Sequence, residues 1–237
     1  MELAKPRVDI GLATNHLEPM LAFWQGEAGI AFDHLLKIRR GQDQHRHDAL
    51  GSVLKINHHA EPLPDTPASG YRELIVARPG LQAPVRLTDP DGNRVTLAPP
   101  GHEGVTQIGV RLAVRDLAAH RKFYTLGLGL SEEAPGAFRA GETLLILEES
   151  PDAPADAGMQ GRGWRYITFQ VFKVDEEHAR ILKAGGARPC RPPPWGPRRA
   201  SRWCVIPMAT GSKSRSAPRS WVPLTRIEDL PVFEHVR

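Results

Sequence analysis

The sequence predicts an α+β fold, and a repeated pattern of strands and helices is the main reason. Residues 9–24 read DIGLATNHLEPMLAFW, and residues 109–124 read GVRLAVRDLAAHRKFY. In each stretch an apolar run suited to a strand is followed by a helix-like segment that ends on two aromatic residues. Further pairs of segments match in the same order, namely 51–59 with 141–149 and 70–77 with 163–170. These matches predict that the chain contains two related halves.

The first predicted helix follows the first predicted strand directly. Residues Leu17, Met20, Leu21 and Trp24 have the i, i+3, i+4, i+7 spacing of one buried helix face. Several strands are expected after it. The last two strands of the first half are joined by the Asp-Pro-Asp-Gly-Asn sequence at 89–93, which predicts a hairpin turn because Gly and Asn tolerate positive φ.

The two halves are predicted to differ in one helix. In the second half a strand leads into VFKVDEEHARILKAGG, a helix with acidic residues in its first turn and two glycines at its end. At the matching place the first half has only ARPGLQAP, at 77–84. The first half is therefore predicted to have a shortened second module.

Composition limits the class of protein. A chain of 237 residues is long enough for two small domains, each with its own core. It contains no run of 18 apolar residues and no signal peptide, so we expect a soluble cytoplasmic protein without a membrane partner. The net charge is +4, but residues 188–237 hold +7 and residues 1–187 hold −3. Because the positive charge belongs to the end of the chain, no nucleic-acid partner is expected.

These segments resemble the vicinal oxygen chelate (VOC) superfamily, which includes glyoxalase I, extradiol dioxygenases and bleomycin-resistance proteins. The resemblance rests on the strand-to-aromatic-helix pattern, the VFKVDEEHARILKAGGA segment and DPDGNRVTL, and it covers roughly residues 7–190. It implies paired βαβββ modules whose strands form U-shaped mixed sheets around a small-molecule pocket. We therefore expect two glyoxalase-like domains, at 5–101 and 104–237.

The end of the second half departs from the family pattern. Family members end this module with a DPDGN turn and a final strand, but here residues 201–214 read SRWCVIPMATGSKS. The codons from Arg202 onward can also be read in a shifted frame, in which each new codon takes the last base of one codon and the first two bases of the next. Read in this way, they can encode Leu-Val-Arg-Asp-Pro-Asp-Gly-Asn-Trp-Ile-Glu-Ile-Ala. We therefore expect a frameshift near 188–201, a frameshifted or disordered tail at 188–237, and a final strand that is absent or poorly packed. An ordinary divergent basic tail is the alternative, and resequencing that stretch decides between them.

The resemblance also indicates where a metal would lie. Family enzymes bind a divalent metal through the first strand, the strand before the link between modules, the first strand of the next module and the last strand. The corresponding residues here are Asp9, Lys55, Glu73 and Thr96 in the first half, and Gly109, Leu145 and Tyr166 in the second. An ammonium has no lone pair to donate and adds positive charge. No cofactor is therefore predicted, and a divalent metal is kept as the alternative.

Asp9, Lys55 and Glu73 are the candidate catalytic residues. If they share a pocket, Lys55 can polarise a carbonyl or hold a carboxylate. Asp9 or Glu73 can then act as a general base, provided that burial raises its pKa. The alternative is a structural cluster of ion pairs without a catalytic role.

Further polar residues are candidates for ligand binding. His45 and His47 are two residues apart and share a face if their segment is a strand, and His58 lies in the expected partner strand. The full candidate set is His45, His47, Asn57, His58, Thr96 and Tyr166. For the histidines, a transition-metal site and solvated or capping side chains are the alternatives.

Two classes of function follow from the resemblance. The leading prediction is a protein that binds a small molecule in a cupped sheet without a catalytic metal. The alternative is a glyoxalase-like lyase or isomerase, or a dioxygenase relative, that uses a metal or the Asp9, Lys55 and Glu73 cluster. In both cases the partner is a small-molecule ligand or substrate, and a homodimer is compatible with the family.

Overall fold

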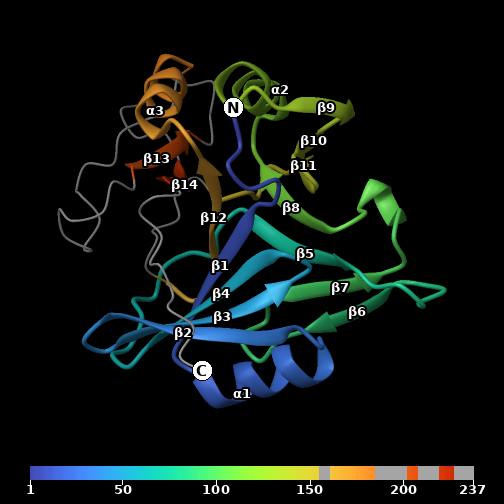
Figure 1. Cartoon of the computed structure of the whole chain (residues 1–237), viewed down its shortest axis with the longest axis vertical. Helices are drawn as coiled ribbons and strands as arrows, with labels where there is room; N and C mark the ends of the chain where they lie inside the picture. The colour runs from blue at the N-terminus through green and yellow to red at the C-terminus, as the bar shows by residue number, and fades with distance from the viewer. Residues whose placement is uncertain (155–160, 185–201, 208–218, 227–237) are drawn as a thin grey trace.

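The predicted α+β fold is confirmed in a computed structural model, which describes residues 1–154, 161–184, 202–207 and 219–226 (Figure 1). Two seven-stranded mixed sheets form the molecule. Sheet A contains, in spatial order, β13 (Arg202–Pro207), β14 (Arg219–Arg226), β12 (Gly163–Val171), β1 (Asp9–Thr14), β4 (Ser52–His59), β3 (Gln42–Ala49) and β2 (Ala31–Arg39). Sheet B contains β6 (Val85–Thr88), β7 (Arg94–Ala98), β5 (Tyr71–Ala77), β8 (Ile108–Val114), β11 (Thr143–Glu149), β10 (Ala137–Ala140) and β9 (Ser131–Ala134).

The α-helices are short and each follows the first strand of a module, whereas the 3-10 turn η2 (His102–Gly104) connects β7 to β8. Besides η2, the helical segments are α1 (Leu17–Ala22), the π-helical turn η1 (Phe23–Glu27), α2 (Leu117–Lys122), the π-helical turn η3 (Phe123–Gly127) and α3 (Val174–Lys183). No helix among the described residues is long and apolar enough to span a membrane. One continuous apolar core joins both sheets to the helices, with Trp24, Tyr124 and Phe169 among its largest buried side chains.

The predicted repeat is visible in the strand pairing. In the first half β1 pairs in parallel with β4, and in the second half β8 pairs in parallel with β11. The helix after each first strand ends in the same π-helical turn, closed by the Ala28 N–H on the Phe23 carbonyl and by the Leu128 N–H on the Phe123 carbonyl. Both halves therefore share a detailed local structure as well as an order of elements.

Each sheet combines strands from both halves. β12 of the second half pairs antiparallel with β1, and β5 of the first half pairs antiparallel with β8. In Figure 1, β1, β4 and β12 lie side by side in sheet A, while β5 lies beside β8. The predicted boundary between domains, at residues 101–104, falls on η2, which connects β7 to β8. Strands from before the predicted boundary thus pair with strands from after it in both sheets.

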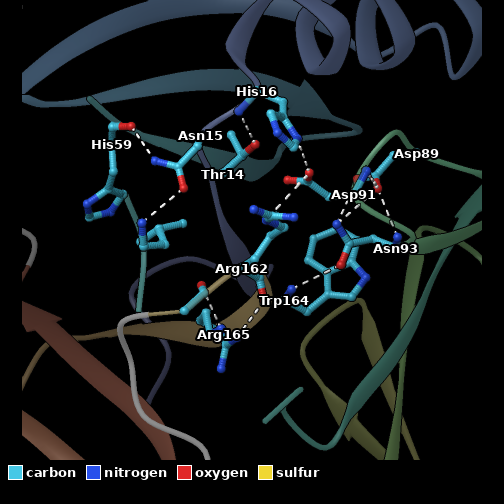
Figure 2. A network of polar contacts seen from close by, with 12 residues as sticks. Thr14, Asn15, His16, His59, Asp89, Asp91, Asn93, Arg162, Trp164 and Arg165 are labelled. Atoms are coloured by element: carbon cyan, nitrogen blue, oxygen red, sulfur yellow. Dashed lines mark hydrogen bonds and ion pairs between the residues drawn. The ribbon is translucent and has the colours of Figure 1, made fainter. Parts of the chain in front are cut away.

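The turn at 89–93 forms the predicted hairpin between β6 and β7. Asp89 Oδ1 accepts the N–H groups of Asp91 at 3.0 Å and Asn93 at 2.8 Å, and Gly92 adopts a positive φ of 85°. The turn also reaches other elements, as Figure 2 shows: Asn93 Oδ1 accepts the Trp164 N–H of β12 at 3.2 Å, and Asp91 pairs with His16 Nδ1 at 2.7 Å. It therefore joins both sheets as well as two strands.

Replacing Asn93 with Ala is expected to lower the free energy of unfolding by about 1–3 kcal/mol. The buried Trp164 N–H loses its acceptor, and both Asp89 oxygens lose the Asn93 amide that donates to them. Urea unfolding followed by tryptophan fluorescence measures the change. The control Arg86→Ala, at an exposed position of the same hairpin, should stay within about 0.5 kcal/mol of the original protein. Equal stability of the two variants would contradict this role for the turn.

Of the two outcomes expected for the final strand, absence and poor packing, the structure contradicts absence. β14 pairs in parallel with β12, and β13 pairs antiparallel with β14. This β13-β14-β12 order repeats the β6-β7-β5 order of sheet B. Strand pairing needs only backbone groups, and the RWCVI and RSWVPLT sequences are rich in residues with high β-propensity. The predicted frameshift point, near 188–201, lies in a part of the chain that the structure does not describe.

Candidate functional site

Asp9 and Lys55 form a buried ion pair in sheet A. Lys55 Nζ lies 3.1 Å from Asp9 Oδ2 and donates to Thr168 Oγ1 at 3.1 Å. A second ammonium, from Lys5, lies 2.6 Å from Asp9 Oδ1. The Asp9 side chain is fully buried, and Gln170 Nε2 also donates to it at 3.2 Å. Asp9 is thus a shared acceptor at the centre of a positively charged cluster.

The electrostatics of this cluster do not support a general base. Desolvation pushes the pKa of Asp9 upward, but the charges of Lys55 and Lys5 and the hydrogen bonds that Asp9 accepts outweigh it, and the pKa falls to about 2. Burial lowers the pKa of Lys55, and Asp9 opposes this only in part. The condition for Asp9 as a base, a raised pKa, is therefore not met.

Neutral polar side chains extend the same face of sheet A. Asn57 Nδ2 donates to the Tyr166 hydroxyl at 3.0 Å and to the Leu12 carbonyl at 2.8 Å. Gln44 Nε2 donates to Asn57 Oδ1 at 2.8 Å. Tyr166 lies over Gly11, where a Cβ would come within 2.2 Å of the phenol ring. Glycine at position 11 thus leaves room for the aromatic ring, and the predicted residues Asn57 and Tyr166 lie together.

A second charged cluster lies in sheet B and surrounds Arg111. Glu73 accepts a hydrogen bond from Thr96 Oγ1 at 2.5 Å and from Arg111 Nε at 2.9 Å. The two terminal nitrogens of Arg111 pair with Glu103 and Glu148. All five residues line a cavity of about 460 Å³. Three carboxylates thus hold one guanidinium at the wall of this cavity.

Glu73 is as poor a general base as Asp9. Burial pushes its pKa upward, but hydrogen bonds from Thr96 and Arg111 lower it below the ordinary value. For Arg111 the effects are reversed. Burial lowers the pKa of its guanidinium, and the hydrogen bonds to the glutamates raise it above the ordinary value. Both groups are therefore held in their charged forms.

The structure separates the three candidate catalytic residues. Asp9 and Lys55 lie in sheet A, whereas Glu73 and Thr96 lie in sheet B. The reason is that β5, which carries Glu73, pairs with β8 and so belongs to the other sheet from β1. The expected pocket that contains Asp9, Lys55 and Glu73 together is not formed.

The candidate histidines lie on the opposite face of sheet A from Lys55. Side chains alternate along a strand, so Gln44 on β3 shares the face of Asn57, and His45 and His47 point the other way. There they contact the ring of Phe32, and His47 Nε2 lies 3.2 Å from Gln25 Nε2. Burial lowers the pKa of His47 to about 4, so its imidazole is neutral near pH 7.

His58 follows the same alternation and belongs with His45 and His47. It sits next to Asn57 on β4 and pairs across the sheet with Asp43, so its side chain is on the face away from Asn57. Among the described residues, no group of three or more His, Cys, Asp or Glu side chains could hold a metal ion. The alternative of a histidine metal site thus finds no ligand set in this part of the chain.

Both polar clusters have a cation where the family resemblance expects a metal. Lys55 takes this place between β1, β4 and β12, and Arg111 takes it between β5, β8 and β11. Neither side chain has a lone pair for a metal, and each repels a second cation. The side chains that the structure describes therefore do not fit a divalent metal in either sheet.

Sequence reasoning missed Arg46, Glu103, Arg111 and Glu148. Arg111 lies two residues after Gly109, which was taken as the position that faces the pocket, so alternation alone places it on the same face. Arg46 lies between the two candidate histidines and was not considered. For Glu103 no local pattern indicates a role, since it comes from η2 rather than from a strand.

Replacing Arg111 with Gln is expected to lower the free energy of unfolding by about 1–3 kcal/mol, because three neighbouring carboxylates lose their shared partner. The control is Arg139→Gln, which removes a guanidinium that bonds one exposed carboxylate, Glu133, and the carbonyls of Gly104 and Glu142, and it should change stability less than Arg111→Gln does. Urea unfolding at low and high salt measures both. A smaller effect for Arg111 than for Arg139 would contradict the importance of this cluster.

Asp9→Asn is expected to remove an acid-sensitive contribution to stability. The folded-state pKa of Asp9, about 2, lies below the unfolded value of about 3.9. The carboxylate therefore contributes about 2–3 kcal/mol that is present above about pH 4 and is lost as the pH falls through the folded value. Unfolding measured across this range should show a flatter dependence for Asp9→Asn than for the control Asp43→Asn, whose carboxylate pairs with the exposed Lys37. Parallel profiles would contradict the assignment.

Solved structures place the fold in a known class. Glyoxalase I from Zea mays superimposes with a TM-score of 0.66 at 12% identity, covering 94% of this chain and 94% of that chain. A putative dioxygenase from Bacillus subtilis gives a TM-score of 0.61 at 12% identity, covering 99% of this chain and 87% of that chain. No protein-family model and no curated protein matches the sequence. The chain thus has the VOC fold, as the resemblance implied.

Proposed function

We propose that this protein binds a small molecule in the cavity of sheet B without a catalytic metal. The observation that supports this most directly is Arg111, a guanidinium held at the cavity wall by Glu73, Glu103 and Glu148. Its fixed positive charge balances these carboxylates, as a bound metal balances its ligands in metal-dependent VOC enzymes. The fold shared with maize glyoxalase I supplies the framework and does not by itself define a ligand.

The cavity has the size and lining of a ligand site. Its volume of about 460 Å³ lies within the range of roughly 300–1,000 Å³ found for small-molecule pockets. Ile75, Leu87 and Val95 are its apolar lining residues, and the rest of the lining is polar: Arg86, Arg94 and His102 join the Arg111 cluster, and Thr88 and Thr96 add hydroxyl groups. This pocket therefore favours a polar molecule with several hydrogen-bonding groups.

An enzymatic role is the second candidate, and one observation favours it. Burial lowers the pKa of Lys55, which brings this amine closer to the range in which it can exchange a proton with a substrate. A glyoxalase-like isomerase or lyase would use Lys55 in this way. The low pKa values of Asp9 and Glu73 argue against either carboxylate as the base in such a reaction.

Two measurements on the purified full-length protein test the proposal. After incubation with zinc, nickel, manganese or iron salts and desalting, elemental analysis should find much less than one metal per chain. A stoichiometric metal would overturn the proposal in favour of the enzymatic alternative.

Ligand binding is tested with a panel of neutral amides, alcohols and aromatic compounds, read out by thermal unfolding. Leu87→Trp should reduce the affinity for any compound that binds by at least about tenfold, because the larger ring fills the cavity that Leu87 lines. Leu126→Trp, at a position 65% exposed, is the matched control and should leave binding unchanged. Binding that survives Leu87→Trp would exclude this cavity as the site.

A further inference from the structure

The polar face of sheet A carries more positive than negative charge. Lys5, Arg46 and Lys55 gather there around one carboxylate, Asp9. Both Asp9 oxygens are in use: Oδ1 accepts from Lys5 and from the Val53 N–H at 2.9 Å, and Oδ2 faces Lys55. Asp9 therefore has little capacity left to neutralise a third cation.

Arg46 is the cation that this carboxylate does not reach. It pairs directly with Lys55 across the antiparallel β3 and β4, so the two side chains share a face with Cβ atoms about 4.5–5.5 Å apart. Like charges in this arrangement repel each other, and both residues are only 8% exposed. Arg46 Nε is buried without a hydrogen-bond partner among the described residues. A buried, unpaired guanidinium N–H is unfavourable unless something binds it.

We propose that Arg46 and Lys55 form an oxyanion site that holds the carboxylate of a small molecule between them. One carboxylate oxygen accepts from the Arg46 Nε edge, and the other lies against the Lys55 ammonium. This arrangement relieves the repulsion between the two cations and satisfies the free N–H. It is a second binding site, in the other sheet from the cavity of the proposed function.

The chemistry of the two side chains favours an oxyanion over other ligands. A guanidinium offers planar, paired donors that match a carboxylate or a phosphate, and charge-assisted bonds of this kind are stronger than neutral ones. The neighbouring Asn57 and Tyr166 supply neutral polar groups for the rest of the molecule. The Lys55 side chain keeps 11% of its surface exposed and that of Lys5 keeps 21%, so solvent reaches this end of the cluster.

Oxalate and inorganic phosphate are suitable probes, compared at constant ionic strength with chloride. Calorimetric titration of the full-length protein should show binding of oxalate, with a weaker response to phosphate if a carboxylate is preferred. Arg46→Gln and Lys55→Met should each weaken oxalate binding by at least about tenfold, because each removes a charge-assisted bond. Lys37→Met is the matched control, since Lys37 is exposed on β2 and pairs with Asp43. It should leave binding unchanged.

A second measurement needs no substitution and so remains valid if a variant fails to fold. In a ¹H–¹⁵N spectrum of the unmodified protein, oxalate should shift the Nε–H signal of Arg46 and leave that of Arg121, on α2, in place. Failure of both oxyanions to bind, or binding that is unchanged in Arg46→Gln and Lys55→Met, would overturn the inference. Stronger binding of phosphate than oxalate would replace the carboxylate by a phosphate ligand. If neutral compounds bind in the cavity of sheet B while neither oxalate nor phosphate binds, the inference fails and the proposed function stands.

Discussion

The antiparallel pairing of β1 with β12 and of β5 with β8 determines how the two polar clusters of this protein are assembled. It brings Asp9 opposite Thr168 in one sheet and Glu73 opposite Arg111 in the other. Side chains from the two halves of the chain therefore meet in each sheet, while Asp9 and Glu73, which belong to the same half, are separated. A shift of either pairing by one residue would turn Asp9 or Glu73 to the other face of its sheet.

The two sheets stabilise their central cations differently. Arg111 is balanced by three carboxylates from β5, β11 and η2, and Thr96 completes the hydrogen bonding of Glu73. Lys55 shares its one carboxylate with Lys5 and has Arg46 directly across the ladder. The first cluster is complete without a ligand, and the second has an excess of positive charge. This difference is why the two proposed sites call for different ligands.

Local patterns in the sequence were sufficient for the repeat, the helices and the hairpin at 89–93. The family resemblance brought Asp9 together with Lys55, because β1 and β4 belong to one module. It did not place Glu73, since its neighbours are set by pairing with β8, far along the chain. The same limit applies to Arg46, whose importance depends on its position across from Lys55. The final strand was missed because backbone pairing tolerates side chains that break the family motif.

The π-helical turns after α1 and α2 indicate the order of two events in the evolution of the chain. Each turn widens the helix by one residue. Just after the turn, the Ile30 N–H donates to the Trp24 carbonyl in the first half, and the Leu130 N–H donates to the Tyr124 carbonyl in the second half. An inserted residue of this kind arises rarely, and two independent insertions at equivalent places are a less economical explanation than one. The insertion is therefore older than the duplication, and the ancestral half already had this widened turn.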